Sequence, residues 1–290
     1  MLDDEVKEAT RQLIEEAAQS NAPAGSDTQK VGDFFQSYVD LERRNALGIQ
    51  PIEPLLSEIS SIKNHQQLAS VFAKMLRSGV SGPFGMFVSP DAKKSDQYTV
   101  YVSQSGLTLP DRDYYLVDSP QFEKARIALK VYIVDILEVA QHQNAKRASN
   151  NIFKLEKSLA ILHWDRVKNR DPEATYNKYS AEELKKLMLG FSLDRFLHEI
   201  GLEQQKEYVV RQPDYLKSLG ALMTATSLQL WKDYLTFRLM DAAAPQLSEA
   251  IERRHFEFHS TALSGIEEQK PLWRRGVEAC NGVLGEVVGK

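Results

Sequence analysis

The sequence contains a single cysteine, Cys280, so no disulfide within the chain holds the fold together. Cys280 lies in an apolar helical pattern, which predicts a buried, unreactive thiol rather than a nucleophile. The lack of disulfides does not assign a compartment, because proteins outside the cytoplasm also occur without them. The fold must therefore rest on a hydrophobic core, and 42% hydrophobic residues in a chain of 290 are enough to build one.

The chain also lacks an excess of positive charge. Its 36 lysines and arginines are outnumbered by 40 aspartates and glutamates, giving a formal net charge of −4 and a pI of about 5.9. Nucleic acids bind to basic surfaces, so this balance predicts no nucleic-acid partner. No apolar run is long enough to span a bilayer, and we expect no membrane contact by this chain.

A targeting signal is missing as well. The sequence runs from Met1-Leu2 into the acidic Asp3-Asp4-Glu5, which is neither a basic n-region nor an apolar h-region. Two interpretations follow for localisation. The protein is cytoplasmic, or an N-terminal segment has been removed from it.

Apolar residues recur at helical spacing along most of the chain, which predicts a mainly α fold. Capping signals mark helix starts at Ser26, at Ser119 before Pro120, and at a Ser180/Glu183 capping box. No repeat or linker divides the sequence, so we expect a single domain over residues 1–290. The first helix, over about residues 1–20, is predicted to bury a face made of Leu2, Val6, Ala9, Leu13 and Ala17.

Strand signals are few. Met86–Val88 and Tyr98–Val102 predict an antiparallel pair, and the polar stretch between them is too long for a tight turn, which predicts a loop. Tyr208–Val210 predicts one further short strand, which Pro213 stops. The expected fold is therefore a multi-helix lobe with a small antiparallel β-hairpin.

The segment Gln104–Leu116 joins the predicted hairpin to the helices that follow. Pro110 has no backbone donor, and the carboxylates of Asp111 and Asp113 can accept bonds from nearby amides, so we expect an ordered polar corner. Arg112 brings a planar fork suited to carboxylates or carbonyls. Tyr114 and Tyr115 add apolar area with a polar tip. The pattern favours a structural role over direct chemistry.

This corner and five other motifs, in the same order, resemble the N-terminal region of the M13 (neprilysin-like) zinc metallopeptidases. The resemblance runs from about Ser26-Asp27 to Gly285–Gly289. Each motif is moderately specific alone, and six in order make a chance match improbable. The six are Gly32–Phe35, Ser81–Gly85, Gln104–Leu116, Arg170–Asn177, Arg211–Leu216 and Trp231–Leu235.

Membership of this family implies two largely helical lobes around a chamber. One lobe holds zinc, and the other, which this chain resembles, caps the chamber and admits only short peptides. Zinc belongs to the parent enzyme, and the implied partners are the zinc lobe, in the same chain or as a separate subunit, and an oligopeptide substrate. The family also implies an extracytoplasmic location. Substrate-contacting arginines of some relatives fall near Asp3 here, so no substrate role carries over.

A zinc peptidase of this type needs His-Glu-x-x-His on a helix, because histidines one turn apart hold the metal. The nearest match is His198-Glu199, but Leu202 stands in place of the second histidine and Gly201 predicts a helix end. His255 and His259 share a helical face, yet Glu257 points elsewhere and the sequence identifies no third ligand. We therefore predict no catalytic, cofactor-binding or metal-ligating residue in this chain.

Two other polar clusters have structural interpretations. His163 in His163–Arg166 follows an apolar stripe, which favours a partly buried, hydrogen-bonded histidine over an acid–base group. Arg166, Arg170 and Asp171 are expected to form structural ion pairs. Arg274-Arg275 is expected to pair with acids or lie in solvent.

Three functional hypotheses remain open at this point. The first is the capping, substrate-gating lobe of a zinc-dependent oligopeptidase, inactive alone because His-Glu-x-x-His is missing. The second is a free-standing helical module that binds peptides or proteins. The third, which the sequence favours least, is a separate metalloenzyme that uses His255 and His259.

Overall fold

The structure is a computed structural model that describes residues 2–288, except for the side chains of residues 2–5 and 7. The side chains of Leu2 and Asp3 therefore lie outside the described residues. The chain is mainly α with a small sheet, as predicted, and it divides into two compact units. Unit 1 comprises residues 1–49 and 245–290, and unit 2 comprises residues 50–244. That residues 1–290 act as one domain stays a prediction.

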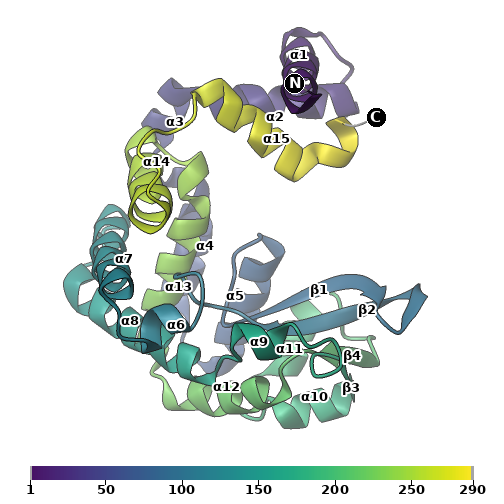
Figure 1. The fold of residues 1–290 in the computed structure, drawn as a ribbon, viewed down its shortest axis with the longest axis vertical. Helices are drawn as coiled ribbons and strands as arrows, with labels where there is room; N and C mark the ends of the chain where they lie inside the picture. Colours follow the sequence, from purple (N-terminus) through teal and green to yellow (C-terminus); the bar gives the residue numbers. More distant parts are fainter. Residues whose placement is uncertain (1, 289–290) are drawn as a thin grey trace. The chain divides into compact units, whose positions relative to one another are not determined.

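In unit 1, the regular secondary structure of the described residues is all helical (Figure 1). Ser26 caps its second helix through a bond from the Gln29 amide, as predicted. Its elements are α1 (Leu2–Gln19), α2 (Asp27–Val39), α3 (Leu41–Leu47), α14 (Glu249–Phe256), a π-helical segment η3 (Glu257–Ala262) and α15 (Leu272–Val288).

The core of unit 1 lies among α1, α2 and α15. Its buried residues are Ile14, Val31, Phe35, Val277 and Cys280. Cys280 is buried, as predicted, and burial raises the pKa of its thiol to about 11, which disfavours the reactive thiolate. The backbones of α1 and α2 approach so closely at Gly32 that a Cβ atom there would lie 2.5 Å from the Ala17 carbonyl oxygen.

The predicted face of α1 is wrong. Val6 and Leu13 are 58% and 56% exposed, whereas Ile14 is fully buried. Ala17 packs beside Ile14 as expected. Apolar residues occur on more than one side of this helix, so spacing alone does not choose the buried side. The buried side of α1 is the one that α2 and α15 pack against.

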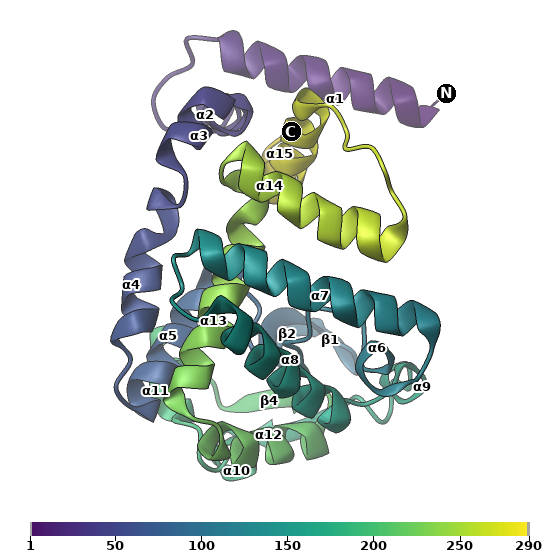
Figure 2. The same ribbon diagram turned by 90° about the vertical axis from the view of Figure 1, so that its left-hand side faces the viewer.

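Unit 2 surrounds α13, whose Trp231, Tyr234, Leu235, Phe237 and Met240 are fully buried. Helices α7 and α8 pack against each other, and both contact α13 (Figure 2). The helical elements are η1 (Gln50–Ile52), α4 (Glu53–Ser61), α5 (His65–Arg77), α6 (Asp113–Leu116), α7 (Pro120–Val139), α8 (Ala145–Leu162), α9 (Arg166–Asn169), α10 (Ala181–Leu187), α11 (Leu193–Glu199), α12 (Pro213–Ala225) and α13 (Leu228–Ala243), with η2 (Ala244–Gln246) at the unit boundary.

The sheet of unit 2 has the strand order β1-β2-β4-β3. Strand β4 (Glu207–Val210) confirms the prediction for Tyr208–Val210, and it pairs in parallel with β2 (Lys94–Gln104). Strand β3 (Asn177–Ser180) was not predicted. It pairs antiparallel with β4 and leads directly into α10 through the predicted Ser180/Glu183 capping box.

The predicted loop between the hairpin strands is wrong. Strand β1 (Phe84–Asp91) and β2 extend through the polar stretch, and a two-residue turn, Ala92-Lys93, joins them. The hairpin of β1 and β2 extends beyond the short strands β4 and β3 (Figure 1). The first five residues of β2 are exposed, so polar side chains cost little there, and they hide the strand signal.

No helix among residues 2–288 combines the length and apolarity that crossing a bilayer requires.

Candidate functional site

The segment that precedes α6 lines an open pocket of about 430 Å³ in unit 2. We call it the corner pocket. Two of the sequence motifs meet there, the Gln104–Leu116 corner and the segment that begins with Arg170. The pocket is lined by Gln104–Leu107, Leu109–Arg112, His163, Trp164, Arg166, Asn169 and Arg170.

A buried polar network holds the inner side of this corner. Glu156 of α8 is fully buried, and its carboxylate accepts bonds from the Thr108 hydroxyl at 2.6 Å and the Tyr115 hydroxyl at 2.5 Å. The Tyr115 hydroxyl in turn accepts the Leu109 amide at 3.0 Å. Arg238 of α13 donates to the Thr108 hydroxyl at 3.0 Å. Burial raises the pKa of Glu156, which makes these donors important for holding its charge.

The corner also depends on a glycine. Gly106 has a φ of +96°, and its carbonyl accepts the Tyr234 hydroxyl at 2.9 Å. A Cβ atom at this position would lie 2.7 Å from the Pro83 Cα and 2.7 Å from the Tyr234 hydroxyl. Pro83 is itself held, because its carbonyl accepts the Tyr215 hydroxyl.

We expect Gly106→Ala to lower the free energy of unfolding by about 2–4 kcal/mol, because it combines left-handed strain with a backbone clash. Gly201→Ala is the matched control. Gly201 has a φ of +76°, but no atom lies within 4 Å of the place that an alanine methyl group would take, so only the strain of about 1 kcal/mol applies there. Urea unfolding measures both. Equal losses would contradict the close packing at Gly106.

Side-chain amides fix the outer side of the pocket. Gln104 pairs with the backbone of Trp164 in both directions, with its Nε2 donating at 3.1 Å and its Oε1 accepting at 2.8 Å. Gln212, at the start of α12, accepts the Gln104 amide at 2.9 Å and donates to Asn169 at 2.8 Å. These bonds join β2, α9 and α12, so the pocket wall is a preorganised part of the fold.

His163 confirms the structural interpretation. It is 7% exposed, its Nε2 lies 3.0 Å from the Ser105 carbonyl oxygen, and its ring stacks edge-on with Tyr215 at 4.9 Å. Burial lowers its pKa to about 4, helped by the nearby positive charge of Arg112. The imidazole is thus neutral at pH 7, and Nε2 donates to the carbonyl.

This lowered pKa predicts a pH-dependent stability. Between pH 6.5 and 4 the unfolded chain binds a proton at His163 that the folded chain does not, so stability is lost as pH falls. By pH 5 the loss is about 2 kcal/mol. Urea unfolding of the wild type and His163→Gln at pH 7.5 and 5 measures it. The stability advantage of the wild type over the variant should shrink by that amount, whereas the exposed His198→Gln control should show no such trend.

The charges of the corner pocket are predominantly positive. Arg166 forms the predicted ion pair, with Asp111 as its partner. Asp111 also accepts the Asp113 amide at 2.8 Å, as expected for an ordered turn. Arg170 is exposed at the rim, and Asp171 caps the backbone amides of residues 173 and 174 instead of pairing with it. The side chain of Arg112 is half-buried and makes no hydrogen bond or ion pair with the described residues.

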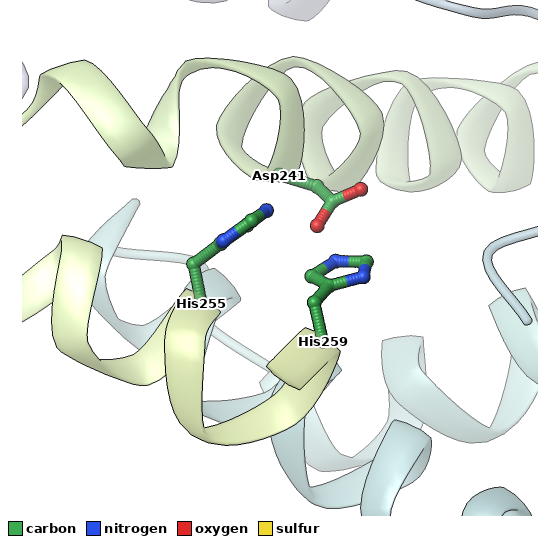
Figure 3. A group of neighbouring side chains, drawn as sticks. All are labelled: Asp241, His255 and His259. Atoms are coloured by element: carbon green, nitrogen blue, oxygen red, sulfur yellow. The ribbon is translucent and has the colours of Figure 1, made fainter. Parts of the chain in front are cut away.

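The histidines of the two candidate metal motifs lie at the end of α11 and on α14 and η3. His198 and Glu199 end α11, and Gly201 follows with a φ of +76°, so helical spacing does not continue to Leu202. His255 lies on α14 and His259 on η3, with ring centroids 4.2 Å apart (Figure 3). Phe258 beside them is buried.

A catalytic zinc takes three protein ligands, and the histidine pair gives unit 1 only two. The third side chain drawn in Figure 3, Asp241, belongs to unit 2, where it accepts the Tyr132 hydroxyl at 2.8 Å. The family's zinc motif does not occur in the 290 residues. The residues of this chain therefore do not reproduce that zinc centre.

We expect the purified chain to hold well below one zinc per molecule after dialysis. Elemental analysis of the wild type and of the double variant His255→Ala/His259→Ala checks this. The two should give the same low value. One zinc per wild-type chain that disappears in the double variant would contradict the expectation and support a metal role for the histidine pair.

Comparison with known proteins identifies the family. The sequence matches peptidase family M13 over residues 1–290, and the chain belongs to this family as its N-terminal, largely helical part. Endothelin-converting enzyme-like 1 of Mus musculus is 24% identical over 300 residues, and endothelin-converting enzyme 1 of Rattus norvegicus is 24% identical over 285. These alignments cover 98% and 93% of this chain, but only 38% and 37% of the relatives.

Comparison with solved structures gives the same family. Zinc metalloprotease Zmp1 of Mycobacterium tuberculosis, in complex with an inhibitor, matches with a TM-score of 0.94 and 32% identity. Its open state matches with a TM-score of 0.95. The matches cover 99% of this chain and 44% and 45% of the Zmp1 chain. The chain thus spans less than half the length of these relatives, which confirms the family resemblance and leaves the activity of a whole enzyme to be proposed.

Proposed function

We propose that this chain is the capping, substrate-gating lobe of a zinc-dependent oligopeptidase and that it is inactive by itself. The observation that carries the proposal is the match to the N-terminal part of family M13 over all 290 residues, in a sequence without His-Glu-x-x-His. The catalytic zinc then belongs to a second lobe, in the same parent chain or in a separate subunit, and oligopeptides are the substrates of the joined enzyme. By analogy with the family, the enzyme works outside the cytoplasm.

Two features support a gating role. Zmp1 is described in an open state and in a partial open state, which fits an enzyme whose lobes move. In this chain, buried and partly buried hydrogen bonds hold the corner and its pocket. A rigid cap that moves as a body excludes water and large substrates from the reaction, and its opening admits short peptides.

Peptide hydrolysis tests the proposal. The chain alone should cleave no fluorogenic oligopeptide, with or without added zinc, and an M13 zinc lobe joined to it should cleave them. An immunoblot of source cells shows whether the lobes share one chain. A band well above the 32.9 kDa of this sequence supports a larger parent enzyme. Zinc-dependent cleavage by the chain alone would contradict the proposal.

The alternative is a free-standing module that binds peptides or proteins. A band at 32.9 kDa, together with no gain in hydrolysis when a zinc lobe is supplied, would favour it. Peptide affinity of the chain alone does not separate the two functions, because a capping lobe also faces substrate.

A further inference from the structure

Arg112 is a charged residue of the corner pocket whose side chain has no partner among the described residues. Its side chain is half-buried, its Nε is shielded from solvent, and no described residue accepts a hydrogen bond from it or pairs with it. The Nε of Arg275 also has no partner, but its guanidinium pairs with Glu252. The buried arginines Arg44 and Arg238 are hydrogen-bonded. Arg44, for example, donates to three backbone carbonyls and to Glu252. A donor that is shielded from solvent is costly without an acceptor, so an anion within reach of this guanidinium would be stabilised.

The remaining charges of the pocket do not compensate Arg112. The carboxylate of Asp111, the one acid in the lining, is taken by Arg166 and by the Asp113 amide. Arg170 adds a second positive charge at the rim. His163 is neutral at pH 7 and donates its proton to the Ser105 carbonyl, so it neither attracts nor repels an anion.

The lining also contains apolar surface. Leu107, Leu109, Pro110 and Trp164 line the same pocket as Arg112. A bare phosphate ion would leave this surface unused, whereas a peptide offers apolar side chains next to its carboxylate. A planar guanidinium also matches a carboxylate with two parallel hydrogen bonds.

We propose that the corner pocket binds a carboxylate group of an oligopeptide through Arg112, with Arg170 adding positive charge at its rim. This inference rests on the proposed function for the choice of a peptide, and on the pocket itself for the choice of a carboxylate. The carboxylate is the C-terminal group or an acidic side chain, which share the same chemistry. Arg112 has a binding role in this proposal.

Calorimetric titration of the 290-residue chain tests the inference without any peptidase activity. The probes are an N-acetylated tetrapeptide with a free C-terminal carboxylate, its C-terminal amide, the amide with an internal glutamate, and inorganic phosphate. We expect the free acid to bind at least about tenfold more tightly than the plain amide. Arg112→Gln should remove that difference, Arg112→Lys should keep part of it, and Arg170→Gln should reduce it less. Arg195→Gln, on α11 and outside the pocket, is the control and should change nothing.

The outcomes separate the sources of the anion. If the glutamate-containing amide binds as tightly as the free acid, the pocket accepts side-chain carboxylates too, which supports the inference. Equal affinity for acid and plain amide overturns it, and so does phosphate binding as tightly as the peptide. If Arg112→Gln does not fold, the acid–amide comparison on the wild type and on Arg112→Lys still decides. Loss of this binding would leave the gating proposal intact, because hydrolysis by the joined lobes is measured separately.

Discussion

Replacing Glu156 with alanine is expected to lower the free energy of unfolding by about 3–5 kcal/mol. Glu156 is fully buried, and its carboxylate accepts the hydroxyls of Thr108 and Tyr115. Alanine would leave both hydroxyls without this acceptor and would remove the negative charge near Arg238, which is 9% exposed. Buried donors and charges that have no partner lower the free energy of unfolding, and the cavity left by the shorter side chain lowers it further.

Urea unfolding of Glu156→Ala, Glu156→Gln and Lys157→Ala measures this effect. Glutamine keeps one acceptor in nearly the same volume, so we expect its loss to be smaller than that of alanine. Lys157 is the next residue on α8 and is exposed, so its replacement should change stability by less than about 0.5 kcal/mol. A Glu156→Ala variant as stable as Lys157→Ala would show that this network does not hold the corner.

Unit 1 contains a second buried carboxylate, and we expect Glu252→Ala to cost a similar amount, about 3–5 kcal/mol. Glu252 is 3% exposed and pairs with Arg44 at 3.0 Å and with Arg275. Arg44 is itself only 6% exposed. Removing the carboxylate would leave two shielded guanidinium groups, on α3 and α15, without their shared partner.

Hydrogen exchange of backbone amides is the measurement that assigns this loss to a unit. In Glu252→Ala, protection should fall in α2, α14 and α15 of unit 1, and the protection of α13 in unit 2 should fall less. Glu257→Ala, an exposed change shortly after it in the chain, should leave all of these unchanged. Unchanged exchange in α15 of Glu252→Ala would contradict the role of this ion pair.

The sequence predicted those parts of the fold that depend on local chemistry. The caps at Ser26, Ser119 and Ser180, the strand at Tyr208–Val210 and the buried His163 are all confirmed. The cap predictions depend on side chains that bond to the backbone of the same segment. The predictions for the strand and for His163 depend on apolar runs in the sequence.

The wrong and missed predictions concern features that depend on contacts between distant parts of the chain. Ile14 is buried instead of Leu13 because α2 and α15 cover that side of α1. Strand β3 is too short and too polar to show a pattern, and only its pairing with β4 makes it a strand. Both follow from contacts between residues that are far apart in sequence.

The candidate site was predicted in part. The corner Gln104–Leu116 was recognised as an ordered structure, but its anchors Glu156 and Arg238 were not. A signal for them exists, because each is a charged residue in the buried stripe of a helix, where Ile152 and Leu159 flank Glu156 at helical spacing. Arg112 was expected to bridge carboxylates or carbonyls of the chain, yet no described residue takes that place.

The central claim is that this lobe limits a zinc peptidase to short substrates. Its most direct test compares an M13 zinc lobe alone with the same lobe joined to this chain, on a fluorogenic oligopeptide and on a large unfolded protein. We predict that the joined enzyme cleaves the oligopeptide and leaves the large protein intact. Cleavage of both substrates by the joined enzyme, at the same relative rates as by the zinc lobe alone, would contradict a gating role.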